Sequence, residues 1–153
     1  MKAVFILLAP LLFLASCNNE TGLPLQHAAD CRFSTPEALA TSIALCLRDA
    51  DFTCASSYMP GMGNINGQPQ AEHLLVTAFK DEIANLRTQI TQRGGDLTKL
   101  KLLEVTQNDQ DVVLKITMHL KAGKLRFTMQ PVGLFQSEGS WFLLGSGFEV
   151  GWE

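Results

Sequence analysis

The stretch of sequence that decides the fold is Val112-Val113-Leu114-Lys115-Ile116-Thr117-Met118-His119-Leu120-Lys121. Every second residue, from Val112 to Leu120, is apolar, and the residues between them are mostly polar. Successive side chains of a strand point to opposite faces, so this alternation predicts a strand with one face in a core and the other in solvent. The segment therefore predicts a sheet that is covered on one side.

Strand patterns continue on both sides of this segment. Upstream, Leu100, Leu102 and Val105 begin a strand, which we expect to be interrupted at residues 108–110. Downstream, a turn at residues 122–124 leads to a strand with Leu125, Phe127 and Met129, whose alternation falters at Pro131, where we expect a bulge or a sheet edge. A turn at residues 137–140 precedes a final strand over residues 141–150. The pattern predicts a four-stranded antiparallel meander.

Helical patterns occupy the preceding part of the chain. Thr35-Pro36-Glu37 combines an N-capping hydroxyl, a proline at the first helical position and a carboxylate in the first turn, and predicts a helix that ends near Asp49. Asp51 can cap a short second helix to about Tyr58, and residues 60–69 read as a loop. Apolar residues at three- and four-residue intervals then predict a long helix over residues 70–93, ended by Gly94-Gly95.

Helices followed by an antiparallel meander indicate the α+β class. Three segments carry a family resemblance: Thr35-Pro36-Glu37-Ala38-Leu39-Ala40, Asp49-Ala50-Asp51-Phe52 and Gly139-Ser140-Trp141-Phe142-Leu143-Leu144. On them, residues 34–153 resemble the cystatin-like cone of the nuclear transport factor two superfamily, especially its small secreted and lipoprotein members. The resemblance implies N-terminal helices packed on a curved four-stranded sheet. The long helix and the Gly- and Asn-rich loop before it depart from the family pattern.

Length and composition fit one domain with an apolar leader. The 153 residues are 46% hydrophobic and 18% charged, with a formal charge of −3, which excludes a disordered chain. The cations form no basic run, so we expect no nucleic-acid partner.

The N-terminus carries an export signal. Lys2 precedes a twelve-residue apolar run over residues 3–14, too short to span a bilayer. The run ends in Leu14-Ala15-Ser16-Cys17, which resembles the lipobox of bacterial lipoproteins. The resemblance implies cleavage of residues 1–16, a thioether-linked diacylglycerol at Cys17 and acylation (palmitate) of its new amino group. An ordinary secretory signal whose cysteine enters a disulfide is the alternative.

The residues after Cys17 suggest where the chain is held. Asn18 is not the aspartate that many Gram-negative bacteria use for inner-membrane retention, so we expect a lipid anchor in the outer membrane, on its periplasmic side rather than the cell surface. Residues 17–33 lack periodicity and are predicted to be a lipidated tether to a domain over residues 34–153. The mature chain has a formal charge of about −4, since only Lys2 is lost, so we expect the acyl chains alone to hold it on the membrane.

Three further cysteines allow one internal disulfide in an oxidising compartment. Cys46 and Cys54 flank a helical corner eight residues apart, and this pair is our first choice. Cys31 with Cys54 is the competitor, because Cys31 lies on a segment able to fold over the helices. Cys31 with Cys46 comes last, and three reduced thiols are the remaining alternative.

No catalytic constellation is visible in the sequence. His119 belongs to the polar face of its strand, His73 lies near the start of the long helix beside Glu72, and His27 is expected to be exposed in the tether. The three histidines have no metal-ligand spacing, no serine has a nucleophile-elbow context, and no cofactor motif appears. We therefore expect no catalytic residue, no metal and no cofactor.

An apolar ligand could occupy the cone, although its lining would more simply be a filled core. The candidate lining residues are apolar side chains of the long helix and the strands: Phe79, Leu86, Met118, Phe127, Met129, Phe142 and Phe148. Our main hypothesis is an envelope-anchored, non-enzymatic lipoprotein that binds a protein partner or a small apolar ligand. The alternatives are an envelope hydrolase or isomerase of the same fold, and an inhibitor or immunity lipoprotein.

Overall fold

The computed structural model describes residues 21–59, 70–110 and 113–153, and within them two helices precede an antiparallel sheet. The helices are α1 (Pro36–Asp49) and α2 (Gln70–Gln92); short 3-10 turns form η1 (Ala29–Cys31), η2 (Ala55–Ser57) and η4 (Leu97–Lys99). The strands are β1 (Leu100–Gln110), β2 (Val113–Ala122), β3 (Leu125–Pro131), β4 (Leu134–Ser137), β5 (Ser140–Leu143) and β6 (Phe148–Trp152). The α+β class is confirmed.

Helix α1 begins and ends where its sequence predicts. The Thr35 hydroxyl accepts a hydrogen bond from the Ala38 amide at 3.1 Å, and Pro36 occupies the first turn, where its missing N–H costs nothing. Ala50 adopts a left-handed conformation (φ 52°), and its amide donates to the Cys46 carbonyl, which closes the last turn.

Helix α2 also matches its predicted pattern. Phe79, Ile83, Leu86 and Ile90 are buried at helical spacing. Gly94 takes a φ of 81°, which a glycine adopts without strain, and the Gly95 amide then donates to the Ile90 carbonyl at 2.9 Å. The predicted loop at residues 60–69 lies outside the described residues.

The short second helix predicted from Asp51 to Tyr58 is wrong in extent. Asp51 Oδ1 accepts from the amide and the hydroxyl of Thr53, at 3.1 and 2.5 Å, so the carboxylate closes a local turn instead of capping a helix. Only Ala55–Ser57 form a single 3-10 turn.

Strand β2 is the centre of the sheet. One edge pairs with β1 along its whole length, and the other edge pairs with β4 at Leu114 and with β3 over Met118–Ala122. The apolar face predicted for this strand is confirmed, since Ile116, Met118 and Leu120 are buried. The predicted interruption at residues 108–110 is wrong, because β1 continues through them and Asn108 pairs with Lys115.

The sheet has six strands, not four, because the last two predicted strands are each broken in two. Pro131 pairs with Phe148 and Leu134 with Leu143, so two residues, Val132 and Gly133, face four, residues 144–147. Proline has no N–H to continue the ladder, and Gly145 and Gly147 ease the bend on the opposite strand. At Pro131, where a bulge or a sheet edge was predicted, the ladder ends and resumes at Leu134, and the predicted final strand over residues 141–150 becomes β5 and β6.

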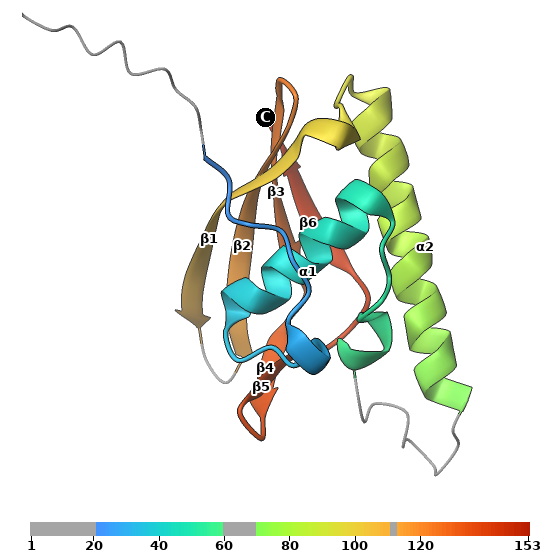
Figure 1. Ribbon diagram of the computed structural model, residues 1–153, viewed down its shortest axis with the longest axis vertical. Coiled ribbons are helices and arrows are strands. Elements are labelled where there is room, and N and C mark those ends of the chain that lie inside the picture. Colours follow the sequence, from blue (N-terminus) through green and yellow to red (C-terminus); the bar gives the residue numbers. More distant parts are fainter. Residues whose placement is uncertain (1–20, 60–69, 111–112) are drawn as a thin grey trace, which may run out of the picture.

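Both helices cover the same face of the sheet (Figure 1). Helix α1 crosses the strands and α2 runs along the β6 side, where Phe79 meets the Phe148 ring at 6.1 Å between centroids. The turn between β2 and β3 lies at one end of the molecule, together with η4. The β4–β5 hairpin, η1 and η2 lie at the opposite end (Figure 1).

Residues 21–33 are packed against the domain and do not form the flexible tether that we predicted. The Leu23 amide donates to the Leu102 carbonyl of β1 at 2.7 Å, and Phe33 is fully buried. Thr41 of α1 donates its hydroxyl to the Gln26 carbonyl at 3.4 Å. Buried apolar side chains and backbone pairing outweigh the lack of periodicity in this segment, and the domain begins no later than Thr21.

Candidate functional site

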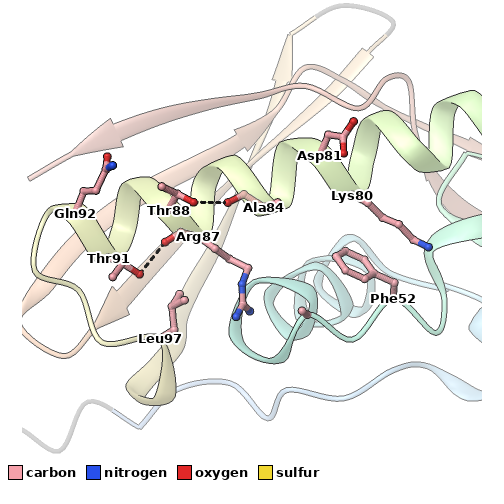
Figure 2. A pocket seen from close by; sticks show the side chains of 10 residues that line it. Phe52, Lys80, Asp81, Ala84, Arg87, Thr88, Thr91, Gln92 and Leu97 are labelled. Atoms are coloured by element: carbon pink, nitrogen blue, oxygen red, sulfur yellow. Dashed lines mark hydrogen bonds between the residues drawn. The ribbon is translucent and has the colours of Figure 1, made fainter.

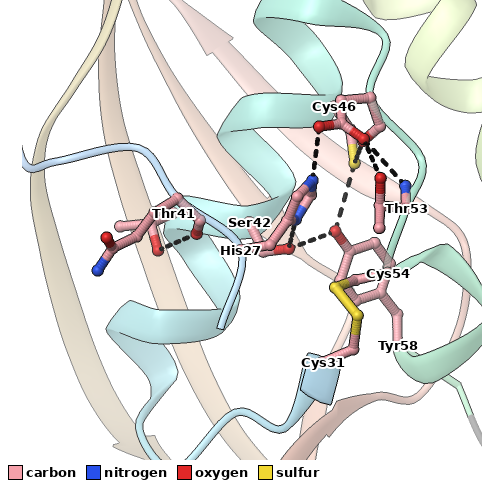
Figure 3. Close-up of a disulfide and its surroundings, with 10 residues drawn as sticks. His27, Cys31, Thr41, Ser42, Cys46, Thr53, Cys54 and Tyr58 are labelled. Carbon is pink, nitrogen blue, oxygen red and sulfur yellow. Dashed lines mark hydrogen bonds and ion pairs between the residues drawn. A yellow bond between two sulfur atoms is a disulfide. The ribbon is translucent and has the colours of Figure 1, made fainter. Parts of the chain in front are cut away.

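A disulfide between Cys31 and Cys54 fixes the N-terminal segment to η2 (Figure 3). The predicted pair Cys46 and Cys54 is therefore wrong, and the competitor is the one that forms. Cys46 points from α1 into the core and remains a buried free thiol. Cys31 reaches Cys54 because residues 21–33 fold back along α1, a course that helix spacing alone did not reveal.

Five residues of the N-terminal segment, α1 and the stretch 51–58 form a closed ring of polar contacts beside this disulfide (Figure 3). His27 Nδ1 lies 2.7 Å from Ser42 Oγ, and His27 Nε2 lies 2.9 Å from Asp51 Oδ2. Ser42 Oγ lies 2.6 Å from the Tyr58 hydroxyl, which is 3.3 Å from Cys46 Sγ. The Cys46 thiol donates to the Asp51 carbonyl at 3.1 Å, which closes the ring.

The ring has the composition of an Asp-His-Ser triad, but its serine is enclosed. Ser42 and Tyr58 are both fully buried, so a substrate carbonyl has no access to the Ser42 hydroxyl. Tyr58 can donate to Ser42 and Ser42 to His27 Nδ1, while the Cys46 thiol donates to the Asp51 carbonyl, which leaves the Tyr58–Cys46 contact without a hydrogen of its own. The arrangement pairs buried polar groups and ties the segment to α1.

The electrostatics of the ring fit this structural role. Burial raises the pKa of the Cys46 thiol to about 11 and also raises the pKa of the Tyr58 phenol. The two hydrogen bonds from Thr53 lower the pKa of the Asp51 carboxyl. Cys46 and Tyr58 are therefore neutral at neutral pH, and Asp51 is ionised.

The sequence pattern did not reveal this ring, because residues 17–33 lack periodicity and His27 was therefore expected to be exposed in a tether. The His27 side chain is only 17% exposed. The available signal was Ser42, which lies between Leu39, Ile43 and Cys46 on the buried side of α1. A buried hydroxyl needs a hydrogen-bond partner, so a polar residue at that position predicts one from elsewhere in the chain.

One groove, of about 620 Å³, lies between the end of α1 and α2 (Figure 2). Two of its cations, Arg87 and Lys80, already have partners. Arg87 donates from Nη1 to the Leu47 and Arg48 carbonyls at 2.7 and 3.1 Å, which caps the C-terminus of α1. Lys80 lies over the Phe52 ring, 5.5 Å from its centroid. These contacts hold α2 against the end of α1, so the groove is the junction between the two helices.

A second pocket, of about 650 Å³, opens at the far end of the molecule between η1, η2 and the β4–β5 hairpin. It is lined by charged, hydroxyl and aromatic side chains from all three segments: Asp30, Cys31, Arg32, Ser56, Ser57, Phe135, Ser137, Glu138, Ser140 and Phe142. We call it the hairpin pocket. The amides of Trp141 and Leu143 donate to the carbonyls of Phe33 and Tyr58, both at 2.8 Å, and so join its walls.

Three features characterise the hairpin pocket. Asp30, Arg32 and Glu138 are exposed, and their side chains make no hydrogen bond or ion pair with another described residue. The half-buried Phe135 and Phe142 rings lie 5.4 Å apart between centroids. Three of its residues, Asp30, Cys31 and Glu138, have a positive φ of 50–55°, a conformation that costs energy outside glycine and concentrates at functional sites.

The predicted cavity lining packs as a filled core. Phe79, Leu86, Met118, Phe127 and Met129 are buried, and Phe148 packs on Phe79. Phe142 alone among the seven candidates lines either of the two pockets described above. A small apolar ligand inside the domain therefore gains no support from the packing.

The remaining predicted positions do not converge. His119 lies half-buried on the polar face of β2, with Nε2 3.5 Å from Thr106 Oγ1. His73 belongs to α2, but its side chain is outside the described residues, as is Cys17. Within residues 21–59, 70–110 and 113–153, no group of His, Cys, Asp or Glu could hold a metal ion. No helix in the same ranges has the length and apolar content needed to cross a membrane.

Comparison with known proteins found no family model, curated protein or solved structure that matches this chain.

Proposed function

We propose that this protein is a lipid-anchored, non-enzymatic binding module of the bacterial envelope. Residues 14–17 supply the acylation motif, and the Cys31–Cys54 disulfide is of the kind that persists in oxidising compartments outside the cytosol. Helices packed on one face of a bent antiparallel sheet support the resemblance to cystatin-like cone domains. Asn18 favours the outer membrane and its periplasmic side.

The hairpin pocket is the proposed binding surface, and its occupant is a protein of the envelope. The observation that carries this choice is the set of exposed charges, Asp30, Arg32 and Glu138, around the Phe135–Phe142 pair. Aromatic and arginine side chains dominate the binding energy of protein interfaces. A secreted toxin is one such partner, in which case the protein acts as an inhibitor or immunity lipoprotein.

The Asp51-His27-Ser42 contacts favour a hydrolase as the second candidate, because they bring together a nucleophile, a base and a carboxylate. Full burial of Ser42 supports the non-enzymatic function instead. Ser42→Ala separates the two: a hydrolase loses turnover of an ester or amide substrate, whereas a binding module keeps its partner and loses only stability.

Acylation is tested by Cys17→Ser, with Cys46→Ser as the control. In cells supplied with labelled palmitate, the wild type and Cys46→Ser take up label and sediment with the outer membrane after a high-salt wash. Cys17→Ser takes up no label and leaves that fraction. If Cys17→Ser remains in the outer membrane with label, anchoring through Cys17 is wrong.

The binding surface is tested by a photocrosslinking amino acid at Ser137 or Glu138, with Lys115 and Lys80 as control positions away from the hairpin pocket. In intact envelopes the pocket positions give one discrete protein adduct, and the control positions do not. Arg32→Ala or Phe142→Ala, placed in the same chain, abolishes the adduct. Equal adducts at all four positions would rule out the hairpin pocket.

A further inference from the structure

The polar side chains of the hairpin pocket are free to bind a partner. Besides its three charged residues, the pocket has four serine hydroxyls that form no hydrogen bond with another described residue: Ser56, Ser57, Ser137 and Ser140. Ser57 and Ser140 are also half-buried, so water reaches them only in part. A pocket of about 650 Å³ with this many free donors and acceptors fits an occupant that has polar groups of its own.

The sheet edge beside the pocket is already occupied. Strand β5 is the last strand on this side of the sheet. The amides of Trp141 and Leu143 donate to the carbonyls of Phe33 and Tyr58, so the chain itself takes up the outward hydrogen bonds of β5. A partner therefore cannot add a strand to β5, and the side chains of the pocket must recognise it.

The free charges of the pocket favour a cation. Asp30 belongs to η1 and Glu138 to the turn between β4 and β5, so each of these two walls carries a free carboxylate. Arg32 is the single cation among the residues that line the pocket. The described lining thus has a formal charge of −1, and the whole chain, at −3, has the same sign. Charge complementarity selects a basic group as the occupant, and a hydrogen bond from such a group to a carboxylate is stronger than a neutral one.

The aromatic pair fits the apolar part of a basic side chain. The Phe135 and Phe142 rings, half-buried and 5.4 Å apart, offer a surface for the methylene stem of a lysine or arginine. The face of an aromatic ring also attracts a cation. The Arg32 guanidinium and the serine hydroxyls can then bind the carbonyls of a polypeptide backbone, provided that this backbone is extended and has its own polar groups free.

We propose that the hairpin pocket takes an extended, basic segment of its protein partner. The proposal rests on the hairpin pocket being the binding surface. The charge of a lysine or arginine of this segment pairs with Asp30 and Glu138, its stem lies on the Phe135–Phe142 pair, and Arg32 holds the backbone beside it.

The first test is competition against the photocrosslinked adduct at Ser137, in cell envelopes opened so that added peptides reach both faces of the outer membrane. Three synthetic nonapeptides carry Lys-Leu-Lys, Glu-Leu-Glu or Gln-Leu-Gln between flanking Gly and Ser residues. We expect the lysine peptide to halve the adduct at a concentration at least tenfold lower than the other two. If the three peptides act equally, or if the glutamate peptide competes best, the basic segment is wrong and the binding surface stands. If Ser137 gives no adduct, both proposals are wrong.

The second test is direct binding of the same peptides to the purified full chain in detergent micelles, followed by the NMR shifts of the amides of residues 30–32 and 137–142. The wild type should bind the lysine peptide at least tenfold more tightly than the glutamate peptide. Asp30→Asn/Glu138→Gln removes both carboxylates and should reduce this preference to less than threefold. Glu104→Gln/Glu149→Gln changes the net charge equally at exposed positions of β1 and β6 and should keep it. Equal loss in both variants would overturn the proposal, because net charge rather than the pocket would then select the peptide.

Discussion

At the residue scale, the ring of His27, Ser42, Asp51, Tyr58 and Cys46 shows how buried polar groups can fasten an irregular segment. The two hydroxyls and His27 Nδ1 have hydrogen-bond partners, which is what burial requires, and His27 Nε2 lies 2.9 Å from Asp51 Oδ2. The Tyr58 ring also packs between Phe33 and Phe79, with centroids 5.5 and 5.1 Å away. Tyr58 therefore serves the apolar core and the polar ring together.

Tyr58→Phe isolates the polar contribution, because it removes one hydroxyl and keeps the ring. We expect the free energy of unfolding to fall by about 1 to 2 kcal/mol, since Ser42 is left with a buried partner missing. Thr88→Ala removes an exposed hydroxyl bonded to the Ala84 carbonyl and should cost less than about 0.5 kcal/mol. Urea denaturation gives the free energy of unfolding of both variants. Equal losses would mean that the Tyr58 hydroxyl stabilises the fold no more than an exposed hydroxyl does.

Cys46 gives a prediction for pH. Its folded pKa, about 11, lies above the ordinary value of 9.0, so folding favours the protonated thiol. The stabilisation is complete below pH 9 and is lost as the pH rises towards 11, because the unfolded chain releases the proton first. The stability difference between the wild type and Cys46→Ala should therefore shift against the wild type over this range, as measured by urea denaturation at pH 8, 9, 10 and 11. A constant difference would contradict the shift.

At the element scale, β2 combines a buried and a polar face in one strand. Ile116→Ala should lower the free energy of unfolding by about 2 to 4 kcal/mol, because it leaves a cavity at a fully buried position. His119→Ala, on the other face, should change it by less than about 0.5 kcal/mol. Thermal and urea denaturation measure both. If His119→Ala instead abolishes turnover of an envelope substrate while stability is unchanged, the non-enzymatic function is wrong.

The Cys31–Cys54 disulfide holds the N-terminal segment, residues 21–33, against the rest of the domain. Cys31→Ser/Cys54→Ser opens a loop of sequence separation 23, for which chain entropy predicts a loss of about 3 kcal/mol. Amide exchange should rise first in residues 21–33 and only later in β2.

Trypsin separates the three cysteines, since Arg32 and Arg48 lie between them, so a non-reduced digest of the wild type should link the Cys31 and Cys54 peptides. A link to the Cys46 peptide would refute the pairing.

At the scale of the whole molecule, the domain extends to the N-terminal side of the predicted boundary at residue 34. A chain that begins at Ser34 loses the disulfide, the His27 contacts, the pairing of Leu23 with Leu102 and the buried Phe33. We expect it to lose more than about 3 kcal/mol relative to a chain that begins at Thr21, a large part of the stability of a domain of this size. Circular dichroism melting of the two chains measures the difference. Equal melting temperatures would show that residues 21–33 add no stability, as predicted for a flexible tether.

The hairpin pocket, with Asp30 and Glu138, lies at the end of the sheet opposite the turn between β2 and β3 (Figure 1). Its walls come from η1, η2 and the β4–β5 hairpin, which are far apart in the sequence, so only the folded molecule assembles the proposed binding surface.

The sequence by itself determined the features that depend on neighbouring residues. The Thr35 cap, the periodicity of α2 and the alternation of β2 each act within a few positions, so the two main helices, the α+β class and a change in the strand at Pro131 could be predicted. The tertiary structure alone decided which distant groups meet: Cys31 with Cys54, His27 with Ser42, and η1 with the β4–β5 hairpin. The physical reason is that residues 21–33 have no local preference for one conformation. Their course is set by the burial of Phe33 and by partners more than ten positions away, which no local pattern encodes.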